Sequence, residues 1–600
     1  MSPMQQMLLG AGAKKDDPLY LDDVFNTSLW VGTNAKRNIP SGIKLDHGNY
    51  SVEFHGDDYL SIPDDHGWEI GSKDFTFEAW IYPDNWDNTY HPIFVVAVAT
   101  GLWVGKLSSN FVVHGFNGST QLTYGTLPTT GQWTHIAVSR SGTSLKLFYN
   151  GTAVATDNSN TYGFDDGGVA YIGNDSTSNY FDGKISNLRL ITKNGQAVVG
   201  SEQAGQALYT SDFTSPTEAI TLSSQGASPA KVVLLCCNTA LNVGGSKAGS
   251  YNGLTITDNG GTAASSSSPF SADSSTYGGL VWIKSREEGG ASDEHVLFDT
   301  ERGWGKKLTS NGNGGQSNAN DGTLTNFNID GFCLGHDTEV NASASGEYVG
   351  WAFKKEKKFM DIQTWTGTDS TQVISHDLGS VPGCILVKAY SQAGKSWKVY
   401  HRGLNNGSSP EDYNLELNSS DNIGSASAQP WDNTAPTATG FTVSGASSQV
   451  NGNGISYVAY IFAHDAGGFG ANGDQSVIKC GNYTGDGTSD GSKFIDMGFE
   501  PGWFMVKCAS GSTQEWMMFD DMRGLIKGEA PQLMANETNA EAGATSFNVR
   551  STGIEIWNSN DAFNGSNNQY IYIAIAKGTG KNMRTPSSGH NVLTLTDFNG

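Results

Sequence analysis

A loop that mixes aromatic and polar side chains is the part of the sequence best suited to hold a ligand. Residues 83–91 read Pro-Asp-Asn-Trp-Asp-Asn-Thr-Tyr-His. A sugar site needs an aromatic platform beside groups that hydrogen-bond to hydroxyls. We therefore predict that Trp86 and Tyr90 contact a sugar ring, with Asp84 or Asp87 accepting hydrogen bonds from its hydroxyls. The alternative, that the two aromatic side chains cap a hydrophobic core, stays open.

Other motifs that could indicate chemistry lack the context that the chemistry needs. The stretch Gly468–Gly473 matches GxGxxG, but a strand pattern follows it, so no helix N-terminus would hold a pyrophosphate. His376-Asp377 and His464-Asp465 have no nucleophile elbow beside them. The six cysteines contain no CxxC pair, which favours buried free thiols over a zinc site or a disulfide framework.

A degenerate repeat, read three times, must supply the elements that position these residues. Each copy has an apolar strand that ends in Lys, an aromatic strand with an Arg-Gly corner, and a closing strand led by Tyr. We expect structural roles for the recurring basic residues, which we place at matching positions of the three copies. They are Lys284, Lys388 and Lys507, and Arg302, Arg402 and Arg523.

The first copy is interrupted. Copies two and three are each preceded by a lead strand, at Trp365 to Leu378 and at Tyr483 to Met497. The lead of the first copy lies far upstream, at Trp30 to Ile43, with the same spacing as Trp365 to Leu378. We infer that residues 47–277 interrupt the first module, and we expect the strand at Trp30 to join the sheet of Leu280 to Lys284.

Composition predicts an all-β protein of several domains. The 600 residues include 76 glycines, 11% are aromatic and only 16% are charged, and turn residues separate short Val, Ile, Tyr, Phe and Trp runs. Only about Ala530 to Ala542 has a helical pattern. The net charge of −24 argues against nucleic-acid binding. No signal peptide and no membrane-spanning run is evident, so we expect synthesis in the cytoplasm without secretion.

The interrupting segment resembles a known fold family. Gln132 to Val138, Phe148-Tyr149-Asn150-Gly151, Tyr171-Ile172-Gly173 and Phe181 to Arg189 follow one another as in laminin-G-like, concanavalin-A-like jelly rolls. Alternation also places Phe75, Phe77 and Ala79 on one face of a strand and Thr76, Glu78 and Trp80 on the other. Asn150-Gly151 predicts a type I′ hairpin turn.

The jelly-roll resemblance implies binding more than catalysis. The glucanases of that superfamily carry Glu-x-Asp-x-x-Glu on one strand, and this sequence has no such triplet. Glu78 stands alone, and we expect it to be a solvated residue of the outer face. Some relatives hold calcium at a loop rim, for which Asp175 and Asp182 are the candidates. Asx-turns are the favoured alternative for both, and we expect no other cofactor.

A second resemblance covers nearly the whole chain. The opening Met4 to Gly12, Leu208 to Pro216, Val232 to Asn238 and Gly279 to Gly303 resemble virion proteins of marine tailed bacteriophages, notably tail-fibre-like proteins. This implies a virion location, other virion proteins and a host cell-surface glycan as partners, and a homo-oligomer, with a trimer as the expected state. A decoration protein of the capsid or tail is the alternative, and a polysaccharide-degrading enzyme is the less favoured one.

The predicted architecture is a laminin-G-like jelly roll inserted into the first of three tandem β-sandwich-like modules. We place an N-terminal segment with the first lead strand at 1–46, the jelly roll at 47–212 and a Gly/Ser/Thr-rich linker at 213–277. The repeat modules follow at 278–362, 363–475 and 476–600. We expect a protein without catalytic residues that attaches to its host through the inserted domain.

Overall fold

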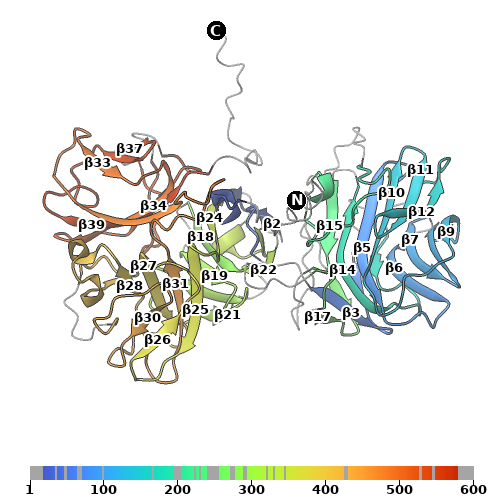
Figure 1. The fold of residues 1–600 in the computed structure, drawn as a ribbon, viewed down its shortest axis with the longest axis horizontal. Helices are drawn as coiled ribbons and strands as arrows, with labels where there is room; N and C mark the ends of the chain where they lie inside the picture. The colour runs from blue at the N-terminus through green and yellow to red at the C-terminus, as the bar shows by residue number, and fades with distance from the viewer. Residues whose placement is uncertain are drawn as a thin grey trace, which may run out of the picture. The chain divides into compact units, whose positions relative to one another are not determined.

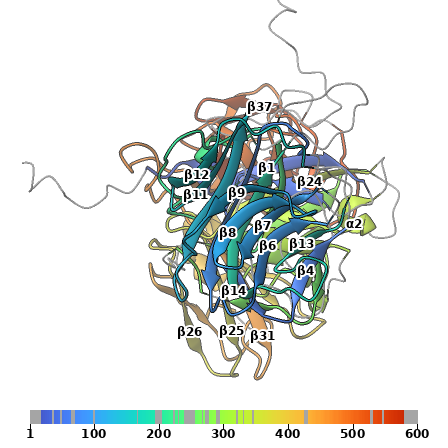
Figure 2. The same ribbon diagram turned by 90° about the vertical axis from the view of Figure 1, so that its right-hand side faces the viewer.

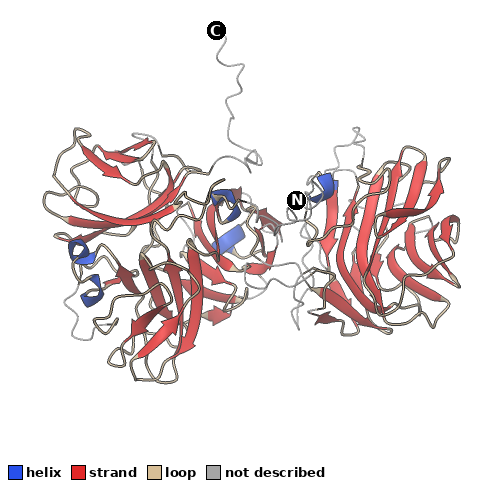
Figure 3. Cartoon of the chain, viewed as in Figure 1, coloured by secondary structure: helices blue, strands red, loops and turns tan. Residues whose placement is uncertain are grey.

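The computed structural model consists almost entirely of antiparallel strands (Figure 3). It describes residues 18–578, apart from 34–36, 46–49, 64–69, 98–99, 165–167, 193–204, 222–223, 229–230, 239–255, 266, 271–276, 288–293, 319–321, 329–330, 343–345, 424–429, 526–529 and 544–546. The opening Met4 to Gly12 and much of the Gly/Ser/Thr-rich linker lie outside the described residues. The chain divides into two compact units, and each is described by itself.

The first unit to be described contains residues 32–278 and 319–345 and is built around two large sheets. One sheet has the order β12-β11-β10-β5-β14-β3-β17, with β15 paired to β14. The strands are β3 (Ser51–His55), β5 (Phe75–Pro83), β10 (Thr134–Ser141), β11 (Ser144–Tyr149), β12 (Thr152–Asp157), β14 (Asp182–Ile191), β15 (Val232–Cys236) and β17 (Ala263–Ser265).

The second sheet of this unit has the order β16-β4-β13-β6-β7-β8-β9, and Figure 2 shows β6 to β9 side by side. Its strands are β4 (Tyr59–Ile62), β6 (Tyr90–Val96), β7 (Leu102–Leu107), β8 (Asn110–Gly115), β9 (Thr120–Tyr124), β13 (Ala170–Ile172) and β16 (Thr257–Asn259). Inward-facing side chains from both sheets form one buried hydrophobic cluster.

Local sequence rules hold well in this unit. Phe75, Phe77 and Ala79 of β5 all lie in the hydrophobic cluster between the sheets, as the alternation predicted. Asn150 (φ 47°) and Gly151 (φ 82°) join β11 to β12, because the tight hairpin turn requires positive φ at both central residues. These two predictions are confirmed.

The other unit contains residues 1–31, 279–318 and 346–600, and its three large sheets share one strand order. The labels β18, β27 and β34 in Figure 1 mark their third strands. The orders are β1-β24-β18-β19-β20-β21, β25-β31-β27-β28-β29 and β32-β39-β34-β35-β36.

The bounds of these strands are, for the first sheet, β1 (Phe25–Val31), β18 (Gly279–Ser285), β19 (Val296–Asp299), β20 (Lys306–Thr309), β21 (Ser317–Asn318) and β24 (Glu347–Lys354). For the second they are β25 (Met360–Thr366), β27 (Cys384–Ala389), β28 (Lys398–His401), β29 (Leu415–Glu416) and β31 (Ser456–Phe462). For the third they are β32 (Ile478–Thr484), β34 (Pro501–Ser510), β35 (Met517–Asp520), β36 (Leu533–Met534) and β39 (Gln569–Ala576).

The lead strands of the three copies pair in the same way. An aromatic residue of each lead strand lies opposite the Tyr that begins the closing strand, and the two rings stack. The centroid distances are 5.7 Å for Trp30 and Tyr348, 5.4 Å for Trp365 and Tyr457, and 4.8 Å for Tyr483 and Tyr570. The strand at Trp30 therefore joins the sheet that contains Leu280 to Lys284, as expected from its spacing.

The remainder of each lead belongs to a smaller sheet. The prediction that each lead forms a single strand was therefore wrong. β2 (Arg37–Pro40) pairs with β23 (Gly331–Leu334), which also pairs with β22 (Leu324–Asn328). β26 (Gln372–Ser375) likewise pairs with β30 (Gly440–Val443). β33 (Lys493–Asp496) pairs with β38 (Gly553–Ile556), beside β37 (Phe547–Arg550). The chain changes sheets inside the lead, because the first part of the lead pairs with the closing strand and the second part pairs with a strand of the smaller sheet.

The helix expected at about Ala530 to Ala542 does not form. Pro531 lacks a backbone N–H, and residues 533–534 form β36, whose Leu533 is fully buried. The Asn536 side chain is held by the backbone N–H of Trp516 at 2.9 Å. Tertiary hydrogen bonds thus outweigh local helix propensity here. The described helical elements are short: η1 (Leu21–Asp23), η3 (Ser224–Gly226), α2 (Thr338–Asn341), η6 (Leu404–Gly407) and η7 (Pro410–Asp412).

Candidate functional site: a rim loop and a buried carboxylate network

The segment that joins β5 to β6 carries one exposed aromatic ring and two exposed carboxylates. Tyr90 is 39% exposed, and Asp84 and Asp87 are also exposed. The backbone N–H of Asp87 donates to the Asn85 side-chain oxygen at 3.2 Å, which is the local bond of an Asx-turn. The loop therefore offers an aromatic face and several acceptors to solvent.

Trp86 has a different environment from Tyr90. Its indole Nε1 donates to the Pro128 carbonyl at 2.8 Å, and its ring contacts those of His91 and Phe181 at centroid distances of 5.2 and 6.0 Å. The side chain is half-buried against the hydrophobic cluster of the sandwich. Of the two alternatives stated for the aromatic pair, this geometry fits core capping for Trp86 and an exposed platform for Tyr90.

Two basic residues of the adjacent strands hold the loop in place. Burial and the nearby Lys106 ammonium lower the pKa of His91 to about 4, so its imidazole is neutral at pH 7. Its Nε2 accepts the backbone N–H of Asn88 at 3.1 Å. The Lys106 ammonium donates to the carbonyl of the same Asn88. A loop fixed at its centre loses little conformational entropy when a ligand binds.

The two aspartates considered for calcium accept hydrogen bonds from protein groups, and for Asp175 these groups are local. One oxygen of Asp175 accepts the N–H and hydroxyl of Thr177 at 3.2 and 2.5 Å, and the other accepts the Asn179 amide at 2.7 Å. Asp182 accepts the Asn85 side-chain amide, and burial raises its pKa. Across the described ranges, no group of three or more His, Cys, Asp or Glu side chains could hold a metal ion. Asp175 thus has the Asx-turn geometry.

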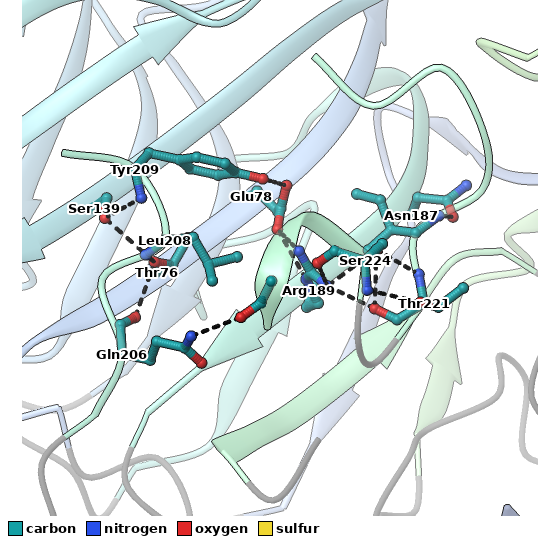
Figure 4. A network of polar contacts seen from close by, with 12 residues as sticks. Thr76, Glu78, Ser139, Asn187, Arg189, Gln206, Leu208, Tyr209, Thr221 and Ser224 are labelled. Carbon is teal, nitrogen blue, oxygen red and sulfur yellow. Dashed lines mark hydrogen bonds and ion pairs between the residues drawn. The ribbon is translucent and has the colours of Figure 1, made fainter. Parts of the chain in front are cut away.

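Glu78 is fully buried, so its prediction as a solvated residue was wrong. Its carboxylate accepts hydrogen bonds from Arg189 Nε at 2.8 Å and from the Tyr209 hydroxyl at 2.9 Å (Figure 4). His135 Nε2 lies 3.1 Å from Oε2, the oxygen that also accepts the Tyr209 hydroxyl, whereas Arg189 Nε donates to Oε1. The side chains of Glu78, Arg189 and His135 are all fully buried.

The burial of Glu78 results from a segment that lies over the outer face of β5. This covering segment comprises residues 205–221 and 224–228. Its Tyr209 reaches Glu78, and its Thr221 and Ser224 carbonyls accept from Arg189 Nη1 at 2.6 and 3.1 Å. The Thr76 hydroxyl also accepts the Leu208 N–H at 2.9 Å. The outer face of β5 is therefore covered by the protein and closed to solvent around Glu78.

The electrostatics of Glu78 favour the ionised form. Burial alone would raise the pKa of its carboxyl, but the Arg189 charge and the hydrogen bond to His135 outweigh it and lower the pKa to about 2. A carboxylate that is paired, enclosed and ionised is suited to holding elements together. Glycoside hydrolysis instead needs two carboxyl groups that reach one bond.

Sequence reasoning missed Arg189, His135 and Tyr209 as partners of Glu78. The available signal was that each of two predicted strands carries a charged residue in its middle. In the structure Arg189 of β14 lies directly opposite Glu78 of β5. Opposite charges at paired positions of neighbouring strands attract one another. The contribution of Tyr209 had no local signal.

The recurring arginines are equivalent in only two of the three modules. Arg302 and Arg523 have buried side chains, and each Nε donates at 2.6 Å to an aspartate three residues earlier, Asp299 or Asp520. Arg402 is exposed. In its module the strand ends at His401, and the position matching Arg302 is held by the buried Leu404. The structural role predicted for the arginines fits Arg302 and Arg523, and the matching position predicted for Arg402 was wrong.

The recurring lysines are equivalent in all three modules and fully buried. Lys284, Lys388 and Lys507 lie opposite Val349, Val458 and Ile571 of the closing strands. Burial lowers the pKa of Lys388 and of Lys507 to about 8. Their ammonium groups donate to backbone carbonyls, including Ser420 for Lys507 at 2.7 Å. The geometry is that of structural hydrogen bonding.

Two family models match separate parts of the chain. Residues 250–578 match a family model described as "Domain of unknown function (DUF7483)". The chain belongs to this family. Residues 54–194 match the model of the "Concanavalin A-like lectin/glucanases superfamily", so the chain joins a concanavalin-A-like, laminin-G-like jelly roll to the family domain. No curated protein matches the chain.

Solved structures resemble parts of the chain. A candidate carbohydrate binding protein from Bacteroides ovatus is 18% identical, with a TM-score of 0.28, over 36% of this chain and 59% of that one. A heptameric SAP-like pentraxin from Limulus polyphemus is 16% identical, with a TM-score of 0.24, over 36% of this chain and 95% of that one. Domain 4 of AbnA, a Geobacillus stearothermophilus arabinanase solved with arabinotriose, is 18% identical, with a TM-score of 0.20, over 27% and 81%.

Within the described part of the chain, the structure contains no helix of the length and hydropathy that would cross a membrane.

Proposed function

We propose that this protein is a virion component of a tailed bacteriophage, of the tail-fibre or appendage type, whose jelly roll binds carbohydrate of the host surface. The observation that carries the binding proposal is the loop of residues 83–91, in which Tyr90, Asp84 and Asp87 are all exposed, in a concanavalin-A-like domain. The virion assignment derives from the sequence resemblance. In this proposal the protein is made in the host cytoplasm and its further partners are other virion proteins.

The arrangement of strands supports a division between scaffold and binding domain. We infer that the jelly roll is inserted into the first of three tandem modules. In the second module β26 ends at Ser375 and β27 begins at Cys384, and in the third β33 ends at Asp496 and β34 begins at Pro501. In the first module the same connection runs from Pro40 to Gly279. Insertions on a rigid frame often carry specificity.

The proposal includes no catalysis. Glu78, the charged residue within strand β5, is enclosed by the covering segment and paired with Arg189. An enclosed carboxylate cannot reach a glycosidic bond. The individual sugar contacts of such a loop would be weak, and several copies on one particle could add about 10² to 10⁴ in avidity.

Binding of the full-length protein to glycans tests the proposal. The probes are arabinotriose, laminarin and surface polysaccharide extracted from marine bacteria, measured by calorimetry or on a glycan array. Tyr90→Ala should weaken binding at least about fivefold, because a sugar ring loses its aromatic platform, and stacking on an aromatic side chain is worth about 1 to 3 kcal/mol. Phe494→Ala is the matched control, since Phe494 is 42% exposed but lies in the third module. Equal binding by the two variants would contradict the proposed site.

The virion assignment has its own test. An antibody raised against the chain should label the tail or its appendages in electron micrographs of purified particles. Labelling spread over the head would favour the alternative, a decoration protein that stabilises the capsid. Release of reducing sugar from the same polysaccharides by the purified chain would favour an enzyme.

A further inference from the structure

The three repeat modules contact one another in a cyclic order, and most of the contacting residues are equivalent. The first set of contacts is made by the last residue of β19, β28 and β35. Asp299 of the first module accepts the Tyr460 hydroxyl of the second at 2.8 Å. His401 of the second module lies 3.1 Å from the Tyr572 carbonyl of the third. The remaining pair joins the third module to the first, where Trp351 Nε1 donates to Asp520 at 3.1 Å.

A second set of contacts follows the same cycle and uses only backbone atoms. In each module a residue that follows β20, β29 or β36 in the chain donates its N–H to a carbonyl of the next module. The acceptor lies just beyond β27, near the end of β34 or just beyond β18, respectively. The bonds are Gln316 N–H to Tyr390 O at 2.7 Å, Ile423 N–H to Ala509 O at 2.8 Å, and Glu541 N–H to Arg286 O at 3.0 Å. The three acceptors immediately follow Ser285, Ala389 and Cys508, which lie opposite the first Tyr of their closing strands.

The seam between the third and first modules carries both kinds of contact found at the two seams between neighbours in the chain. It also contains an ion pair, because the Arg286 guanidinium donates to both Glu541 oxygens at 2.9 Å. The two ends of the described chain meet here. A Cβ atom built on Gly578, beyond the last strand of the third module, would lie 2.3 Å from Asp22, which precedes the first strand.

Aromatic side chains of all three modules share one hydrophobic cluster. Phe353 and Phe462 occupy equivalent positions in the closing strands of the first and second modules, with ring centroids 5.9 Å apart. Phe353 is also 5.8 Å from Trp503 of the third module. The modules therefore have a common core in addition to their pairwise seams.

We infer that the three modules form a closed ring with approximate three-fold symmetry, a trimer made within one chain. A head-to-tail contact closes into a ring when its rotation is a third of a turn, and three equivalent seams are the result. The docking surface of each module fits another module of the same kind, and in this chain every such surface is already occupied. The three-fold symmetry that we expected from three chains is thus supplied by one chain, which carries three scaffold modules and a single jelly roll. This inference concerns the scaffold and does not depend on carbohydrate binding.

Cross-linking of the full-length protein tests the closure. In the variant Arg286→Cys with Glu541→Cys, a short bis-maleimide should link the third module to the first within one chain. The product should keep the mass of one chain, 63.8 kDa, in dilute solution. The matched control is Gln316→Cys with Tyr390→Cys, the equivalent pair at the seam of the first and second modules. The parent chain, whose cysteines are mostly buried, gives the background.

A link between two chains at the Arg286 and Glu541 positions would overturn the closed ring. The same conclusion would follow if the control pair became linked and the seam pair did not. Because the two substitutions also remove an ion pair, amide exchange on the unmodified chain provides a second measurement. The N–H of Glu541 should be protected as strongly as those of Gln316 and Ile423, independently of protein concentration. Fast exchange at Glu541 alone, or protection that disappears on dilution, would show that the ring is open or shared between chains.

Discussion

Replacement of Glu78 by Gln tests the central finding about the jelly roll, that this carboxylate is a structural ion pair. The isosteric amide keeps the shape of the side chain but leaves the Arg189 guanidinium buried without its counter-charge. Loss of one partner of a buried pair typically costs about 3 to 5 kcal/mol. We therefore expect Glu78→Gln to lower the stability of the jelly roll by about 3 kcal/mol or more at pH 7.

The pKa of Glu78 gives an independent magnitude and a pH window. Its folded pKa of about 2 lies below the ordinary glutamate pKa of 4.5, so the folded state binds the proton less tightly than the unfolded state. At about 1.36 kcal/mol per pKa unit, the difference corresponds to about 3 kcal/mol. This stabilisation is fully present above about pH 5 and is lost as the pH falls from there toward 2. Glu78→Gln should remove this part of the acid sensitivity.

Calorimetry of the full-length protein between pH 7 and 3 measures both effects, with amide exchange in β5 and β14 to assign the transition to the jelly roll. A loss of about 3 kcal/mol corresponds to a melting temperature about 6 to 12 °C lower for a domain of this size. Glu53→Gln is the matched control, because Glu53 pairs with Lys184 at 3.0 Å but is partly exposed, and it should cost at most about 1 kcal/mol. Equal melting temperatures for Glu78→Gln and the parent, with unchanged acid sensitivity, would refute the reasoning.

Three further tests compare buried side chains with exposed ones or with the parent chain. Arg302→Ala should destabilise its module by about 3 to 5 kcal/mol because Asp299 would be left buried and unpaired, whereas Arg402→Ala should stay within about 0.5 kcal/mol in chemical denaturation. Lys388→Met should flatten the rise in stability of the parent chain between pH 8 and 10.5, since a lowered lysine pKa makes the unfolded state bind more protons in that window; an unchanged pH profile would contradict this. Trp86→Ala should lower the melting temperature of the jelly roll more than Tyr90→Ala, and the reverse order would show that Tyr90 belongs to the core.

Local pattern predicted much of the fold. Alternation assigned the faces of β5, because successive side chains of a strand point in opposite directions whatever surrounds them. Asn150-Gly151 specified the hairpin turn between β11 and β12, because both residues tolerate the positive φ angles that this turn requires. The spacing of Trp30 to Ile43 identified the distant partner of β24, since the first lead kept the pattern of the other two.

Register within loops was beyond the reach of pattern. The Arg-Gly corners of the three modules look alike in sequence, yet they differ in register. The preceding strand ends three residues before Arg302 and Arg523 but immediately before Arg402, so Leu404 takes the buried position. The helix predicted at Ala530 to Ala542 was wrong because contacts with another strand decide this segment. Leu533 pairs with β35, and the Asn536 side chain accepts the backbone N–H of Trp516.

The sequence by itself determined which face of the sheet Glu78 lies on, and tertiary structure alone decided that this face is covered. Alternation is a property of a single strand, so it separates the two faces without saying what contacts either of them. The covering segment that encloses Glu78 follows β14 in the chain, and Tyr209 reaches the carboxylate only once the sandwich has formed. The environment of a charged side chain depends on segments distant in sequence, whereas the direction in which it points depends on its neighbours.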